Sequence, residues 1–179
     1  SMISGLVTPE RGEVLVGGRK LSGDTDPAKR RIGLVPQDLA LYEDLSAREN
    51  LAYWGAAYGL TGDGLKRRVL EVLERIGLGD RAREPVKRFS GGMKRRLNFG
   101  CGVVHKPKVL LLDEPTVGVD PQSRVRLLEL VREEVAAGTC VLYTTHYMEE
   151  AQDLCNCIAI IDHGKLLSMG TLDELRKLI

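Results

Sequence analysis

Two adjacent carboxylates, Asp113 and Glu114, follow directly after an apolar run at residues 109–112. A continuous apolar run predicts a strand that is covered on both faces, as in a parallel sheet between helices. Ligands of open α/β sheets bind at the C-terminal ends of such strands. One carboxylate there can hold magnesium through water, while the other takes a proton from an attacking water molecule. The pair therefore indicates chemistry on a magnesium nucleotide, although many strand ends carry acids that only contact solvent.

A second pattern suited to phosphate lies at Ser90, Gly91 and Gly92, just before a helix that we expect from about residue 93 to residue 104. A serine hydroxyl and glycine amides at a helix N-terminus favour anions, because free N–H groups and the helix dipole both attract negative charge. Taken alone, the pattern more often marks an ordinary capped turn. Its meaning therefore depends on the motifs around it.

The segments around these motifs alternate between strand and helix patterns. Residues 12–18 are bracketed by glycines and predict a strand of a small antiparallel sheet. Further strands are expected at residues 31–35, 109–112, 140–143, 158–161 and 166–167, and helices at residues 121–137, after His146 and after the capping residue Thr171. This alternation predicts an α/β fold with a mainly parallel sheet flanked by helices.

Residues 46–79 follow helical spacing instead. Apolar side chains such as Leu51 and Trp54 recur three or four positions apart, and Ser46 with Glu49 forms a capping box. This stretch predicts a mostly helical part of the chain.

Length and composition set further limits. The 179 residues, of which 43% are hydrophobic, predict one domain. Within it, the order of strand and helix patterns predicts a core of residues 1–37 and 106–179 and a helical subdomain of residues 38–105. The 26 basic and 25 acidic residues nearly cancel and form no block of one sign, so nucleic acid is not an expected partner. The four cysteines lack zinc-site spacing, which favours reduced thiols. No apolar run approaches the roughly 20 residues of a membrane-spanning helix, so a membrane role requires another subunit.

Five motifs in a fixed order form a family pattern. They are Pro36-Gln37, residues 89–93, residues 109–114, Gly118-Val119-Asp120 and Thr145-His146. In this order they resemble the Q-loop, signature, Walker B strand, D-loop and switch histidine of the nucleotide-binding domain of ABC transporters. The resemblance runs from about residue 5 to residue 179. It implies a P-loop NTPase-like core, a mostly helical signature subdomain and remnants of a small antiparallel β-subdomain.

The resemblance implies an ATPase site with magnesium. By it, Asp113 serves the magnesium site and Glu114 is the general base. Gln37 senses the metal and the attacking water, and His146 contacts the γ-phosphate of ATP.

The resemblance also implies a head-to-tail dimer of nucleotide-binding domains with two shared ATP sites. Ser90, Gly91 and Gly92 then face ATP that is held mainly by the second copy, and Asp120 crosses the interface. A separate transmembrane permease subunit is implied as the other partner, which places the chain in the cytoplasm, peripheral on the inner face of the membrane.

The signature variant and the run 145–151 are similar to the exporter branch of the family. After the Q-loop come Leu39, Leu41 and Tyr42. We expect these residues either to receive a short helix of the membrane subunit or to be ordinary packing residues.

Two alternative functions are a related ATPase that works on DNA or the ribosome and a non-catalytic interaction module. A short, single helical subdomain argues against the first, and the presence of Glu114 and His146 argues against the second.

A phosphate-binding loop of the form GxxxxGK[ST] does not occur in the sequence, and the run at residues 17–21 has the wrong spacing. Residues 2–6 resemble the end of the helix that follows this loop in the family. We therefore expect the chain to begin inside the domain and to lack a strand–loop–helix unit of at least roughly 30 residues. A truncated fragment explains this better than an incomplete gene product. Such a polypeptide is expected to bind ATP weakly and not to hydrolyse it.

Overall fold

A pair of apolar parallel strands, β3 (Ile32–Val35) and β4 (Val109–Asp113), lies at the centre of the fold. The computed structural model describes residues 2–4, 7, 9–21 and 26–177. Strand β5 (Cys140–Thr144) completes a sheet with the order β3-β4-β5. The three central leucines of β4 are at most 5% exposed, which confirms that both of its faces are covered: Leu110, Leu111 and Leu112.

The chain forms two compact units, residues 1–142 and residues 143–179. The predicted α/β class is confirmed, because parallel strands, flanking helices and small antiparallel sheets all occur. The predicted division into residues 1–37, 38–105 and 106–179 stays a prediction.

Three helices of the first unit pack around one apolar core: α1 (Ala47–Ala57), α2 (Gly62–Arg75) and α3 (Gly91–Val103). The capping box of α1 is confirmed, since the Glu49 N–H donates to Ser46 Oγ and the Ser46 N–H donates to the Glu49 carboxylate. Among the fully buried side chains are Leu51, Leu73, Ile76, Leu97 and Phe99. Helix α3 also packs on β3.

Arginine side chains cap the C-terminal ends of these helices. The last carbonyls of a helix have no partner within it. Arg68, buried within the unit, donates from Nε to the Val104 carbonyl at 2.8 Å and from Nη2 to the Val103 carbonyl at 2.9 Å. Arg96 donates to the Ile76 carbonyl at 2.8 Å in the same way. These contacts fix the end of one helix to the body of another.

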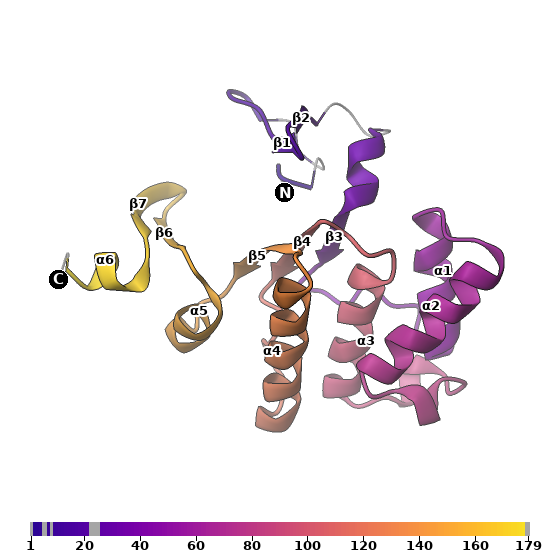
Figure 1. Cartoon of the computed structure of the whole chain (residues 1–179). Helices are drawn as coiled ribbons and strands as arrows, with labels where there is room; N and C mark the ends of the chain where they lie inside the picture. The colour runs from indigo at the N-terminus through magenta and orange to yellow at the C-terminus, as the bar shows by residue number, and fades with distance from the viewer. Residues whose placement is uncertain (1, 5–6, 8, 22–25, 178–179) are drawn as a thin grey trace. The chain divides into compact units, whose positions relative to one another are not determined.

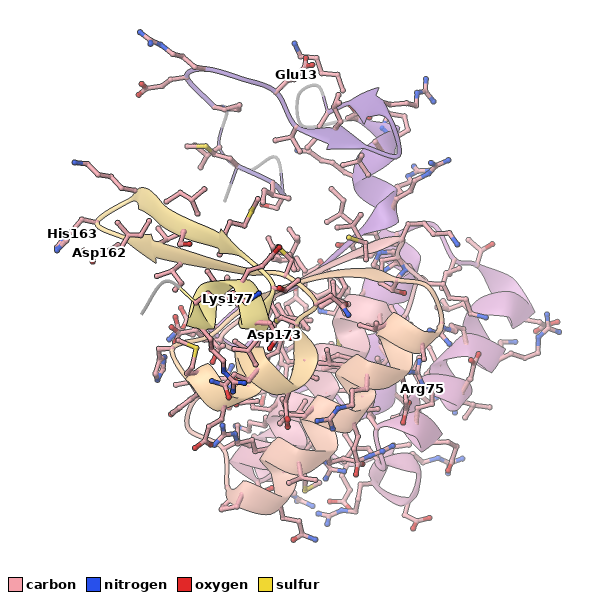
Figure 2. All side chains as sticks on the ribbon, turned by 60° about the vertical axis from the view of Figure 1, so that its left-hand side comes forward. Glu13, Arg75, Asp162, His163, Asp173 and Lys177 are labelled. Carbon is pink, nitrogen blue, oxygen red and sulfur yellow. The ribbon has the colours of Figure 1, made fainter. Side chains whose placement is uncertain are left out.

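Helix α4 (Pro121–Ala136) lies beside α3, as Figure 1 shows. Arg75, labelled in Figure 2, donates to buried Glu134 at 2.8 Å and to Glu133 at 3.1 Å. These ion pairs join the end of α2 to α4.

The N-terminal part contains the small antiparallel sheet, although the strands are shorter than expected. Strand β1 (Leu15–Val16) pairs with β2 (Arg19–Lys20), because Gly17 and Gly18 have positive φ and form a tight turn inside the predicted strand. Short 3-10 turns follow elsewhere in the first unit at Pro27–Arg31, Gly79–Arg81 and Val86–Arg88. Of the segment expected to end a helix, residues 2–4 form a turn, and residues 5 and 6 lie outside the described residues.

The second unit contains α5 (Met148–Leu154), the antiparallel strands β6 (Ile158–Asp162) and β7 (Lys165–Gly170), and α6 (Leu172–Arg176). Figure 2 shows Asp162 and His163 at the tip of the β6–β7 hairpin, where His163 and Gly164 both have positive φ. Thr171 caps α6 as predicted. The hairpin exposes several apolar side chains, among them Ile161, Leu166, Leu167 and Met169. Within the described ranges, no helix has the length and apolar character needed to cross a bilayer.

Candidate functional site

The two carboxylates lie at the C-terminal end of β4, as predicted. Asp113 is the last residue of the strand and is exposed, and Glu114 follows it and is half-buried. Glu114 has a φ of 44°, in the left-handed region. A non-glycine residue in this conformation costs about 1 to 3 kcal/mol and is commonly found at functional sites.

The structure brings Gln37 to Glu114. Its Nε2 donates to Glu114 Oε2 at 3.2 Å. Strand register explains the contact, because Val35 is paired with Leu112 in the parallel ladder, and Gln37 and Glu114 each lie two positions beyond these paired residues in the chain. The carboxyl ends of β3 and β4 therefore open at one edge of the sheet, where ligands of α/β folds bind.

Ser90 caps helix α3. Its Oγ accepts a hydrogen bond from the Met93 N–H at 3.3 Å, and its backbone is extended. The helix consequently begins at Gly91, earlier than the predicted residue 93. Since the first N–H groups of a helix have no partner within it, the amides of Gly91 and Gly92 point out of a helix N-terminus, where an anion is favoured.

Gly92 packs on the start of helix α4 in the same chain. A Cβ atom at Gly92 would lie 2.6 Å from Ser123 Cβ and 3.0 Å from Asp120 Oδ2, so no side chain fits. Asp120 is the N-cap of α4 and accepts from the Ser123 N–H at 2.9 Å. That backbone hydrogen bond and the Ser123 hydroxyl lower the pKa of Asp120. Residues of the motifs at 89–93 and 118–120 thus meet within one chain.

His146 belongs to the second unit. The turn that carries it is held by the carboxylate of Glu150, a residue that is 1% exposed. Glu150 accepts hydrogen bonds from Tyr143 and Thr145, each at 2.8 Å. The Tyr147 N–H donates to Thr145 Oγ1 at 3.0 Å, and the Tyr147 ring lies 4.2 Å from the His146 ring. These contacts fix the turn that presents His146, which is exposed.

A role for three polar residues near these motifs was not predicted from the sequence: Arg95, Asn98 and Glu150. Asn98 and Arg95 contact the loop that carries Gln37. Two signals were present in the sequence. Asn98 is an asparagine in the otherwise apolar C-terminal part of α3, and Glu150 belongs to a pair of acidic residues that follows His146. Neither signal identifies its partner without tertiary structure.

The described residues contain no group of three or more His, Cys, Asp or Glu side chains placed to hold a metal ion. Magnesium does not require such a group, because it is usually bound by one or two carboxylates together with phosphate oxygens and water. Exposed Asp113 beside Glu114 fits that donor set.

Comparisons with known proteins identify the family. Residues 1–117 match the family described as ABC transporter, and the chain belongs to that family. It is 51% identical to the linearmycin resistance ATP-binding protein of Bacillus subtilis, over 98% of this chain and 56% of that protein. It is 38% identical to the Nod factor export ATP-binding protein I of Ralstonia nicotianae, over 97% of this chain and 54% of that protein.

Among solved structures, one described as the ATP-binding subunit of an ABC transporter matches with a TM-score of 0.86 and 32% identity, over 98% of this chain and 73% of that one. The chain spans a little over half the length of the two curated relatives. The matched residues therefore have the fold of the corresponding part of an ABC ATP-binding subunit.

Proposed function

We propose that this chain is the ATP-handling part of an ABC exporter subunit, in which Glu114 activates the water that attacks ATP. The observation that carries the proposal is the hydrogen bond from Gln37 to Glu114 at the open end of the parallel strands. Relatives whose names specify resistance or export support the exporter class.

Each residue of the site would have a role that follows from its position. Asp113, exposed at the strand end, would hold Mg²⁺, which neutralises phosphate charge when it is bound with ATP. Glu114 would accept the proton of the attacking water, and Gln37 would orient both the carboxylate and the water. His146 would contact the γ-phosphate of ATP. The observed 3.2 Å contact makes Gln37 and Glu114 the best supported pair.

We propose a head-to-tail partnership with a second nucleotide-binding domain. The capped N-terminus at Ser90, with the amides of Gly91 and Gly92, would donate to phosphate of ATP held by the other copy. Asp120 would lie at the same interface. The packing of Gly92 on Ser123 supports a single surface built from both motifs.

An aromatic surface is the proposed contact with the membrane subunit. Leu39, Tyr42 and Tyr53 are 37%, 46% and 48% exposed. The Tyr42 and Tyr53 rings meet edge to face at 4.8 Å, and Tyr53 meets Trp54 in the same way at 5.4 Å. Such a surface suits an apolar helix end, and binding there would place the chain at the cytoplasmic face of the membrane.

We also propose that the 179-residue polypeptide binds ATP weakly and does not hydrolyse it. It contains no GxxxxGK[ST] run to wrap the phosphates, so the main phosphate contacts would be missing. Titration of the polypeptide with Mg-ATP is expected to show no micromolar binding. A micromolar dissociation constant or steady phosphate release would contradict this part of the proposal.

The catalytic assignment is tested in a loop-supplied protein, which we define as this chain joined before Met2 to a strand, a GxxxxGK[ST] loop and a helix. Steady-state phosphate release is measured for the unchanged sequence, for Glu114→Gln and for Glu129→Gln, a matched exposed control on α4. We expect Glu114→Gln to lower kcat by about 10²-fold or more, the scale of a lost general base. The control should keep its rate. Equal rates in all three proteins would refute the assignment.

A further inference from the structure

We propose that Arg95 and Asn98, on helix α3, are positioning residues that hold the Gln37 loop against Glu114. The helix that begins at the signature turn and the loop that carries Gln37 would then move as one body. This inference deepens the proposed function and rests on it for its catalytic meaning. Its geometric part concerns contacts within the first unit alone.

Asn98 holds the loop on both sides of Gln37. Its side chain is 2% exposed. Its Oδ1 accepts from the Ala40 N–H at 3.0 Å, and its Nδ2 donates to the Pro36 carbonyl at 3.2 Å. One side-chain amide therefore bridges the beginning and the end of the segment that contains Gln37.

Arg95 lies one helical turn before Asn98, so both side chains share a face of α3. Its guanidinium donates to the Gln37 carbonyl from Nη1 and to the Val117 carbonyl from Nη2, the latter at 3.2 Å. The Val117 N–H in turn donates to the Glu114 carbonyl at 3.2 Å. The planar fork of arginine suits this double contact, and it connects the backbone of Gln37 to the turn that follows Glu114.

The rest of the loop is held by helix α1. Trp54 Nε1 donates to the Ala40 carbonyl at 3.1 Å. Asn50, which is fully buried, accepts from the Tyr42 N–H at 2.8 Å and donates to the Tyr42 carbonyl at 3.0 Å. Backbone groups at residues 36, 37, 40 and 42 thus bond to side chains of α1 and α3. The position of Gln37 is consequently set by these helices as well as by strand β3.

The test uses the Gln37 side-chain amide signal in ¹⁵N NMR spectra of the 179-residue chain without nucleotide. Gln37→Ala identifies the signal by its loss, and Glu114→Ala gives its position when the contact to the carboxylate is absent. We expect Asn98→Ala and Arg95→Met each to move the signal most of the way to the Glu114→Ala position. Arg96→Met, one position along the same helix, is the matched control and should leave the signal in place.

Trp54 gives a second readout, because it is the only tryptophan of the chain and bonds the same loop. Its emission should shift in Asn98→Ala and stay unchanged in Arg96→Met. Arg95 is only half-buried, so Arg95→Met carries the test if Asn98→Ala fails to fold. A Gln37 signal at its original position in folded Arg95→Met would overturn the inference. Failure of the proposed function would appear separately, as unchanged phosphate release in Glu114→Gln.

Discussion

His105 should make the first unit less stable in mild acid. Its ring stacks on Tyr58 with centroids 3.6 Å apart and planes 3° apart. Nε2 lies 3.1 Å from the Ile32 carbonyl, and buried Nδ1 has no hydrogen-bond partner. The neutral ring therefore donates from Nε2. Protonation would add an N–H at Nδ1 where no acceptor is available, beside the positive charge of Arg68.

Burial is the main cause that lowers the pKa of His105 from 6.5 to about 4. The hydrogen bond to Ile32 raises the pKa, and the positive charge of Arg68 lowers it. The unfolded chain then takes up a proton below about pH 6.5, and the folded chain only near pH 4. The stabilisation is complete above pH 6.5 and is lost as the pH falls toward 4. The full shift corresponds to roughly 3 kcal/mol. Because the ring is partly exposed and screened by water, we expect about 1 to 2 kcal/mol.

Urea unfolding of the wild type and His105→Phe at pH 7.0 and about pH 4.5 measures this effect. Phenylalanine can stack on Tyr58 but does not titrate, and the carboxylates common to both proteins cancel in the comparison. The wild type should lose about 1 to 2 kcal/mol more than His105→Phe between the two pH values. Equal losses would refute the reasoning.

Three further predictions concern other contacts. Gly92→Ala should lower the free energy of unfolding by about 1 to 3 kcal/mol through overpacking against Ser123, and adding Ser123→Gly should recover part of it in thermal unfolding. Arg68→Met should lower the free energy of unfolding by about 3 kcal/mol, because two carbonyls at the end of α3 lose their donors. The exposed control Arg67→Met should lower it little, and equal losses in the two variants would refute the capping explanation. Tyr42→Asp in a complete transporter should abolish transport while ATP hydrolysis continues, and normal coupling would discard that surface.

The helices and strands around the site could be predicted from sequence patterns between residues that are close in the chain. The apolar run of β4 and the capping signals at Ser46 and Thr171 are local, and each gave an element at the expected place. The approach of Gln37 to Glu114 follows from strand register. That register could not be read from either strand alone, since it depends on how the two strands pair.

The contacts that fix the site were not predictable from spacing. Asn98 lies in an apolar stretch of α3, and its two partners are roughly 60 positions away in the chain. The close packing of Gly92 on Ser123 likewise depends on how two helices meet. The lack of room for a side chain at Gly92 is a consequence of that packing. The expected strand at residues 12–18 was shortened because its glycines form a turn.

The central claim is that Gln37 and Glu114 act on ATP as a pair. A double-mutant cycle on kcat in the loop-supplied protein tests it most directly, with Gln37→Ala, Glu114→Gln and both together. If the 3.2 Å contact is part of the catalytic arrangement, the double variant should be no slower than Glu114→Gln alone. Rate losses that multiply, as for two independent residues, would contradict the account.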